Sequence, residues 1–228
     1  KLKVNRDGCI DLNDVDAALA EKTALMSVML ANNETGVIQD VATVGERAKR
    51  AGAVMHTDAV QALGKIPVEF AALNVQALTL SAHKIYGPKG AGALVVDKRL
   101  DLRAVLTGGG QERGFRSGTL PTPLCVGLGE AAEICMKEMD AEAKRLKKLQ
   151  ERMLNGLRAK LTDIVVNGDL EHRIPGNLNI SFAYVEGESL IIGIKGLAVS
   201  SGSACTSASL EPSYVLRALG RSDELAHS

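Results

Sequence analysis

Asp58 and Lys84 have opposite charges, and each comes shortly after an apolar segment of strand length. Parallel strands of an open α/β sheet end at one common edge, and these folds bind their ligands there. A carboxylate and an amine at that edge can form a salt bridge with no further role, and their spacing alone favours that interpretation. The neighbouring residues decide between a salt bridge and a ligand site.

Polar side chains next to Asp58 and Lys84 favour a ligand site. Gln61 stands three positions after Asp58, so the two side chains can face one ligand. Ser81 and His83 belong to the predicted turn that contains Lys84. Such a turn can hold an anion with its side chains and backbone N–H groups.

This set of side chains suits pyridoxal phosphate. An amine such as Lys84 forms a Schiff base with this cofactor. A carboxylate such as Asp58 keeps the pyridinium nitrogen protonated, so that the ring can accept electrons. Gln61 can meet the phenolic oxygen of the ring, and Ser81 and His83 can meet the phosphate. The residues therefore predict a pyridoxal phosphate site at the edge of a sheet.

Two further polar segments are candidates for the same site. Residues 31–36 form a polar turn directly after a predicted strand. It is either an ordinary turn, since Asn and Gly favour turns locally, or a source of a cofactor contact through Asn33. Residues 108–119 are rich in glycine, contain two arginines and do not match the P-loop pattern. They form either a flexible surface loop or a loop that contacts an anion.

The four cysteines stand in different surroundings. Small and polar residues surround Cys205, and a segment of this kind cannot pack into a core. We therefore expect Cys205 to be exposed, mobile and reactive. Cys125 and Cys135 lie in an apolar helical pattern and are predicted to be inert core residues. Cys9 follows Asp-Gly and is interpreted as a turn residue.

The segments that must position these residues alternate between strand-like and helix-like patterns. The strand-like segments are apolar on both faces, which is typical of a mostly parallel sheet with helices on both faces, the α/β class. Strands are expected over residues 24–30, 53–57, 77–80 and 91–96, and helices over 41–51 and 59–63.

From residue 123 to 161 the pattern becomes helical, and it is followed by a smaller α+β unit. Strands are expected there over residues 164–166 and 178–182, and helices over 189–194 and 214–219. We place a domain boundary near residue 138. Residues 1–138 would form part of a large cofactor-binding domain, and residues 139–228 part of a small domain that carries Cys205.

Composition excludes several classes of protein. Of the 228 residues, 27 are Lys or Arg and 27 are Asp or Glu, so there is no cationic excess for nucleic-acid binding. No apolar run approaches the length of a membrane span. The cysteines form no CxxC pair, which argues against a zinc site or a disulfide framework and favours a reducing, cytosol-like compartment. The chain begins at Lys1 without Met, and we expect it to be a piece of a longer protein.

Five motifs together resemble one family. They are Asn-Asn-Glu-Thr-Gly at 32–36, His-Thr-Asp-Ala-Val-Gln at 56–61, Ser-Ala-His-Lys-Ile-Tyr-Gly-Pro-Lys-Gly at 81–90, Arg-Ser-Gly-Thr at 116–119 and Ser-Ser-Gly-Ser-Ala-Cys-Thr-Ser at 200–207. In this order they resemble the cysteine desulfurases of the IscS/NifS kind, within the class V aminotransferase-like enzymes. The resemblance covers residues 1–228 and implies the aminotransferase-like fold of pyridoxal phosphate enzymes, fold type I.

The resemblance implies a role for each motif. Lys84 would carry the Schiff base, Asp58 would pair with the pyridine nitrogen and Gln61 would contact the ring hydroxyl. Asn33 would lie near the ring, and Ser81 and His83 at the phosphate. Thr119 would reach the phosphate of the neighbouring subunit, so that the site belongs to a homodimer. Cys205 would be the nucleophile that takes up sulfur.

The implied reaction removes sulfur from L-cysteine, giving L-alanine and a persulfide on Cys205. The persulfide would pass to an iron–sulfur scaffold protein or to other sulfur acceptors, in the cytoplasm or, in a eukaryote, in the mitochondrial matrix. No resident metal site is expected, although the Cys205 persulfide could transiently ligate a cluster shared with the scaffold. Family members also carry an N-terminal segment with a Thr and a His for the cofactor, and a later Arg that holds the substrate carboxylate.

Two other interpretations remain open. The first is a related pyridoxal phosphate enzyme, either a selenocysteine lyase or an aminotransferase. Cys205 argues against the aminotransferase, which does not use a nucleophilic thiol. The second is a sulfur carrier or an inactive platform that only binds partners, and Lys84 beside Asp58 argues against it. Absorbance near 400 nm, expected of a lysine-bound cofactor, would separate an enzyme from a platform.

Overall fold

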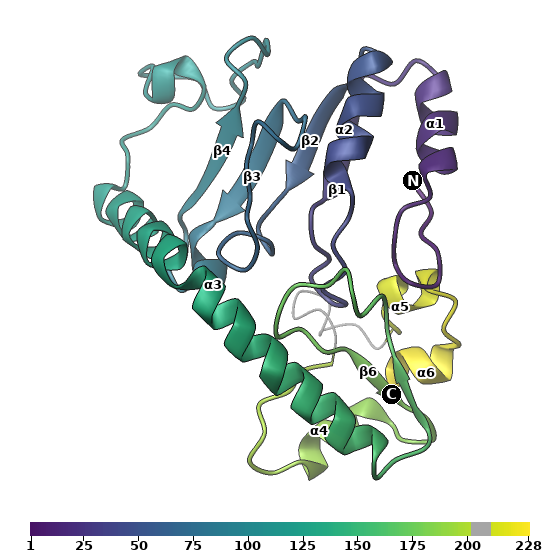
Figure 1. Ribbon diagram of the computed structural model, residues 1–228. Helices are drawn as coiled ribbons and strands as arrows, with labels where there is room; N and C mark the ends of the chain where they lie inside the picture. The colour runs from purple at the N-terminus through teal and green to yellow at the C-terminus, as the bar shows by residue number, and fades with distance from the viewer. Residues whose placement is uncertain (202–210) are drawn as a thin grey trace.

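The computed structural model describes residues 1–201 and 211–228 (Figure 1). The first part of the chain forms a four-stranded sheet in the order β1-β2-β3-β4. Strands β1, β2 and β3 are parallel, and β4 is antiparallel to β3. This mostly parallel sheet with its helices confirms the predicted α/β class. The strands are β1 (Leu25–Met29), β2 (Val54–Asp58), β3 (Ala77–Ser81) and β4 (Gly92–Val96).

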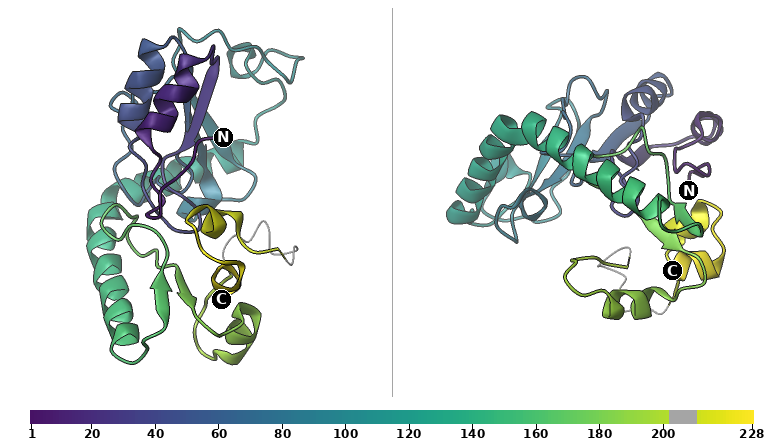
Figure 2. Two further views of the ribbon diagram at one scale, coloured as in Figure 1. Left: turned by 90° about the vertical axis from the view of Figure 1, so that its right-hand side faces the viewer. Right: turned by 60° about the horizontal axis from the view of Figure 1, so that its bottom comes forward.

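Helices α1 (Leu12–Ala20) and α2 (Val41–Arg50) lie side by side and pack against the sheet (Figure 2). The apolar stripe of α2 explains this packing, because Val41, Val44 and Ala48 recur at helical spacing and are all buried. They join a core to which alternate residues of the strands contribute, among them Met26, Val28 and Met55. Leu25, by contrast, leaves 59% of its surface exposed.

A helix of 37 residues, α3 (Thr122–Arg158), leads from this sheet to a second unit (Figure 1). Its amino-terminal half contacts the 3-10 helix η1 (Ala82–Ile85), and a shorter 3-10 helix, η2 (Glu112–Gly114), precedes it. In the described part of the chain, no helix combines the length and the apolar character that crossing a membrane would need.

The second unit contains a two-stranded antiparallel sheet and three short helices. All four elements predicted here are present; the strand over 164–166 has the predicted bounds, and the other three have shifted ends. The proposed boundary near residue 138 falls inside α3. The elements are β5 (Ile164–Val166), β6 (Ile180–Phe182), α4 (Gly187–Gly193), α5 (Tyr214–Ala218) and α6 (Asp223–His227).

The helix predicted over residues 59–63 is wrong. The segment makes a single turn, in which the N–H of Leu63 donates to the carbonyl of Ala59 at 2.9 Å. Gly64 then adopts a φ of +71°, a left-handed conformation that ends a helix. A Cβ on Gly64 would lie 2.6 Å from the Sγ of Cys135, so α3 approaches this turn closely. The approach of α3 requires a glycine at this position.

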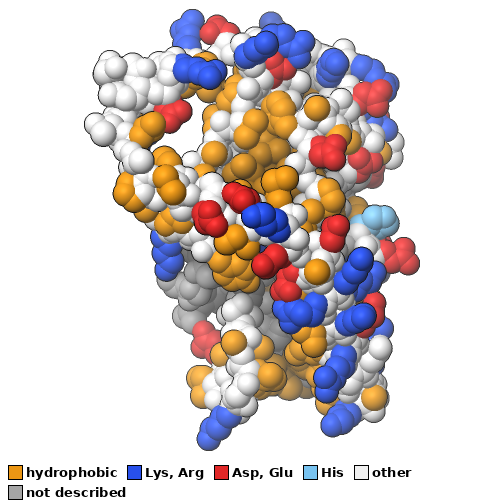
Figure 3. Space-filling model, turned by 60° about the vertical axis from the view of Figure 1, so that its left-hand side comes forward, with side chains coloured by type: hydrophobic (Ala, Val, Ile, Leu, Met, Phe, Trp, Pro, Cys, Tyr) orange, Lys and Arg blue, Asp and Glu red, His pale blue; other side chains and the backbone are white. Residues whose placement is uncertain are grey.

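The prediction that Cys125 belongs to the core is also wrong. Cys125 is exposed on α3, and its neighbour Val126 leaves 66% of its surface exposed. Cys135 is half-buried, as its contact with Gly64 requires. The apolar pattern identified the helix correctly, but no described segment covers the face that carries Cys125. Hydrophobic side chains gather on this side of the molecule (Figure 3).

Candidate functional site

The carboxyl ends of β1, β2 and β3 meet at one edge of the sheet. The register pairs Met29 of β1 with Asp58 of β2, and Asp58 with Thr79 of β3. Backbone hydrogen bonds continue past the strands, from the N–H of Leu30 to Asp58 at 2.8 Å and from that of Ala59 to Thr79 at 3.1 Å. The segments that follow the three strands therefore leave from the same place, as expected of an open α/β sheet.

Asp58 is the last residue of β2 and is half-buried. Its Oδ1 accepts a hydrogen bond of 2.9 Å from the N–H of Val60, which fixes the carboxylate at the start of the turn. A carboxylate can accept about four hydrogen bonds. Asp58 can therefore accept a further hydrogen bond from an N–H or O–H group of a ligand.

Gln61 lies in the same turn and is held by a residue that the sequence interpretation did not consider. Its Oε1 accepts a hydrogen bond of 3.3 Å from the Nζ of Lys65, and its backbone carbonyl accepts one of 3.1 Å from the same nitrogen. The spacing of four positions between Gln61 and Lys65 is the signal that could have revealed this pair.

Ser81, His83 and Lys84 lie where β3 passes into η1. The Oγ of Ser81 and the Nδ1 of His83 are 2.7 Å apart, so hydroxyl and imidazole form one hydrogen-bonded pair. His83 and Lys84 are exposed on η1. Tyr86 ends this short helix with a φ of +63°. Hydroxyl, imidazole and amine thus stand next to one another on one turn.

The turn after β1 is shaped by Asn32, which leaves Asn33 at its exposed tip. The Oδ1 of Asn32 accepts hydrogen bonds of 2.9 Å from the N–H groups of Glu34 and Thr35. Asn33 is exposed, in agreement with a side chain that contacts a ligand.

The structure links this turn to the second unit through Glu34, another residue that the sequence interpretation missed. Only 6% of its surface is exposed, and its carboxylate accepts a hydrogen bond of 2.6 Å from the Oγ of Ser213. The Nδ2 of Asn177 donates to the backbone carbonyl of Glu34 at 3.1 Å. Ser213 stands eight positions after Cys205 in the sequence. Cys205 itself lies outside the described residues.

Thr119 comes from a different region, the loop between β4 and α3. Because β4 is antiparallel to β3, this loop starts at the end of the sheet opposite to Asp58. Thr119 is exposed, and Figure 1 shows the loop beyond β4. The loop is closed internally, since the N–H of Gly118 donates to the Oε1 of Gln111 at 3.0 Å. Contact with an anion, or with a second subunit, remains a prediction.

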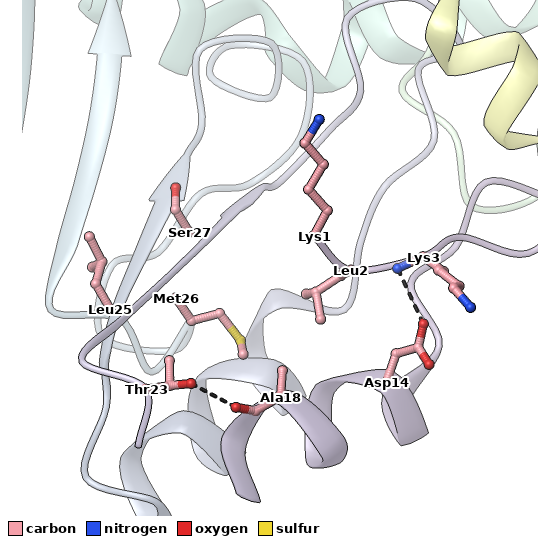
Figure 4. A pocket seen from close by; sticks show the side chains of 9 residues that line it. All are labelled: Lys1, Leu2, Lys3, Asp14, Ala18, Thr23, Leu25, Met26 and Ser27. Carbon is pink, nitrogen blue, oxygen red and sulfur yellow. Dashed lines mark hydrogen bonds between the residues drawn. The ribbon is translucent and has the colours of Figure 1, made fainter. Parts of the chain in front are cut away.

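Two cavities accompany these elements. One, of about 410 Å³, lies beside β1, the outer strand, and no described site residue lines it (Figure 4). Lys1, Leu2, Lys3, Asp14, Ala18, Thr23, Leu25, Met26 and Ser27 line this cavity. The other is small, about 70 Å³, and is lined by Lys65 and Lys84 together with residues of α3. The second cavity touches the candidate site through Lys84, whereas Asp58 and Gln61 do not line it.

Comparison with known proteins gives consistent results. Residues 1–222 match the family described as aminotransferase class-V. The chain is 59% identical to the cysteine desulfurase IscS of Anaeromyxobacter dehalogenans, over the whole chain and 57% of that relative. The chain therefore spans less than two thirds of the length of that curated relative.

Two solved structures resemble the chain closely. One is a NifS-like protein from Rickettsia africae, with a TM-score of 0.90 and 32% identity over the whole chain and 61% of that protein. The other is SspA in complex with cysteine, with a TM-score of 0.81 and 31% identity over 98% of the chain and 62% of SspA. These similarities bear out the predicted fold.

Proposed function

The chain belongs to the aminotransferase class-V family, and from this premise we propose that the complete protein is a cysteine desulfurase. The observation that carries the proposal is the meeting of the segments after β1, β2 and β3, with Asp58, Gln61 and Lys84, at one sheet edge. The similarity to a relative named cysteine desulfurase, and to a protein solved with cysteine, supports L-cysteine as the substrate.

The side chains at this edge fit pyridoxal phosphate. Lys84 offers an exposed amine for a covalent bond to the aldehyde, and Asp58 offers a carboxylate for the ring nitrogen. Gln61 offers an oriented amide. The hydrogen-bonded pair of Ser81 and His83 offers donors for a phosphate. When bound, the cofactor supplies an electron sink for the reaction.

The residues of this chain would act on protons and on sulfur. Lys84, once released from the cofactor, would move a proton from and to the substrate carbon. Cys205 would attack the sulfur of L-cysteine as a thiolate. The carbon–sulfur bond breaks, a sulfur–sulfur bond forms on Cys205, and the carbon takes up a proton. L-cysteine and a thiol thus become L-alanine and a persulfide, and atoms and electrons balance.

The partners follow from the same proposal. The persulfide would pass to an iron–sulfur scaffold or to another sulfur acceptor in the cytoplasm. We also propose a homodimer in which Thr119 contacts the phosphate in the neighbouring subunit. Exposed hydrophobic side chains on β4 and α3, such as Leu94 and Met136, support such an interface.

The proposal is tested by supplying the complete protein with L-cysteine and measuring L-alanine and enzyme persulfide. In a single turnover equal amounts of the two are expected. A selenocysteine lyase would act on L-selenocysteine and leave L-cysteine unchanged. An aminotransferase would form a keto acid and no persulfide, and an inactive platform would form none of these products.

A further inference from the structure

Lys65 holds both the backbone and the side chain of Gln61. Its Nζ donates to the backbone carbonyl of Gln61 at 3.1 Å and to its Oε1 at 3.3 Å. Both residues are half-buried, so water competes less for these bonds than it would on an open surface. One ammonium group therefore ties the side chain of Gln61 to its own turn.

The turn that carries this pair has little room to move. The N–H of Lys65 donates to the carbonyl of Ala62 at 3.0 Å. Behind the turn, α3 comes so close that only a glycine fits at position 64, next to Cys135. The backbone of Lys65 is thus fixed by its hydrogen bond to Ala62, and the preceding residue, Gly64, is packed against α3.

The charges around Lys65 leave Gln61 as its hydrogen-bond partner. Lys84 and Tyr86 line the small cavity from one side, and Cys135 and Glu142 line it from α3. The carboxylate of Glu142 is bonded to the Nε of Arg145 at 2.7 Å. Burial raises the pKa of the Cys135 thiol, which favours its neutral form. Burial and the nearby charge of Lys84 lower the pKa of Lys65.

An ammonium group only donates hydrogen bonds, and this decides which way the amide of Gln61 faces. Its oxygen must point to Lys65, so its N–H₂ group points away and presents donors to a ligand. Without this contact the amide could rotate by half a turn and present an acceptor instead. A ligand atom opposite the oriented amide has to be an acceptor, such as a deprotonated ring oxygen.

We propose that Lys65 is a positioning residue, which orients the Gln61 amide so that its N–H₂ group donates to the deprotonated ring oxygen of the cofactor. This inference rests on the proposed function, because the ring oxygen belongs to pyridoxal phosphate. A donor to that oxygen stabilises its charged form. It therefore lowers the pH at which the cofactor bound to Lys84 loses its proton.

The test is a pH titration of the visible absorbance of the cofactor bound to Lys84, in the complete protein. In Lys65→Met the midpoint should rise by about half a pH unit or more, the size expected for the loss of one hydrogen bond. Lys65→Arg keeps a charged donor, so its midpoint should lie at least halfway back from that of Lys65→Met to that of the unaltered protein. Lys49→Met, an exposed position on α2, serves as the control and should leave the midpoint unchanged.

A double variant separates orientation from charge. If Lys65 acts through the amide, Lys65→Met should add no shift once Gln61→Ala has removed that amide. An equal shift in both backgrounds, or none in Lys65→Met alone, would overturn the inference. Should Lys65→Met fail to fold, Lys65→Leu, which likewise has no hydrogen-bond donor on its side chain, takes its place with the same expectations. Absence of the visible band from the unaltered protein would overturn the proposed function and this inference together.

Discussion

The hydroxyl of Ser213 donates a hydrogen bond of 2.6 Å to the carboxylate of Glu34, although 179 positions separate them. Glu34 belongs to the turn after β1, and Ser213 is the N-cap of α5. The bond therefore joins the edge that carries Asp58 and Lys84 to the second unit. It also fixes a point shortly after the segment that contains Cys205.

Ser213 does two tasks, and its replacement should cost more than the loss of a helix cap. Its Oγ also accepts hydrogen bonds from the N–H groups of Val215 and Leu216, at 3.2 and 3.3 Å. In Ser213→Ala we expect the free energy of unfolding to fall by about 2 kcal/mol, because a cap is lost and a buried carboxylate loses a donor. Urea denaturation measures this change.

Ser222→Ala is the matched control for this prediction. Ser222 caps α6 in the same way, through a bond of 3.3 Å from the N–H of Leu225. It should cost only about 0.5 to 1 kcal/mol, the usual loss for a cap. Equal losses in the two variants would show that the bond between Ser213 and Glu34 adds nothing to stability.

Lys84→Ala should abolish covalent attachment of pyridoxal phosphate and all turnover, while the fold persists. Lys84 is exposed on η1, so removal of its side chain opens no cavity in the core. Borohydride reduction followed by peptide mapping should place the cofactor on residue 84 in the unaltered protein. Lys89→Ala, an exposed position in the next turn, should keep the label. A reduced label at any other lysine would contradict the assignment.

Asp58→Asn should keep the cofactor bound and lower the rate of L-alanine formation by orders of magnitude. The amide oxygen can still accept the bond from the N–H of Val60, so the turn is retained. A neutral amide cannot hold the proton on the pyridine nitrogen, and the ring then withdraws electrons less strongly. Thermal unfolding should change little. A rate close to that of the unaltered protein would show that Asp58 has no such role.

The pair formed by His172 and Asp169 predicts a pH dependence of stability. The Nδ1 of His172 lies 3.1 Å from the Oδ2 of Asp169, and this contact raises the pKa of the imidazole. Hydrogen bonds from His172 lower the pKa of Asp169. The His172 contribution is complete below its ordinary pKa of 6.5 and is lost as the pH rises above it. The Asp169 contribution is complete above 3.8 and is lost as the pH falls below it.

The pair should therefore stabilise the fold mainly between about pH 4 and pH 6.5. The urea midpoint of His172→Gln should lie below that of the unaltered protein at pH 5, and the two should coincide at pH 9. Because the His172 side chain is exposed, the difference should shrink in high salt. A difference that is larger at pH 9 than at pH 5 would contradict the prediction.

Local patterns predicted the six strands and the helices α2, α3, α4 and α5, but they did not indicate α1 or α6. The strand predicted over 53–57 is β2, shifted by one residue, and Asp58 stands at its end as expected. The sequence pattern was less informative about single hydrogen-bonded turns. The turn after Asp58 contains Gly64 at a positive φ, and that glycine ends what the apolar spacing indicated as a helix.

Contacts between distant residues could not be derived from periodicity. The bond between Glu34 and Ser213 depends on how the second unit packs on the first. Likewise, apolar spacing placed Cys125 on a helix but does not say whether another segment covers it, and in the described structure none does. The contact of Lys65 with Gln61 could have been inferred from their spacing of four positions, but the place of Lys65 beside Lys84 depends on packing that periodicity does not show.

The last prediction concerns the thiol that takes up sulfur. Cys205→Ser should still bind pyridoxal phosphate on Lys84 but form no persulfide, because a hydroxyl cannot accept sulfur from L-cysteine. Cys125→Ser is the control, since Cys125 is also exposed but stands on α3, and it should keep full sulfur transfer. Iodoacetamide should modify Cys9 and Cys135 slowly, because burial raises the pKa of both thiols. Sulfur transfer by Cys205→Ser in the complete protein, or its loss in Cys125→Ser, would show that Cys205 is not the acceptor.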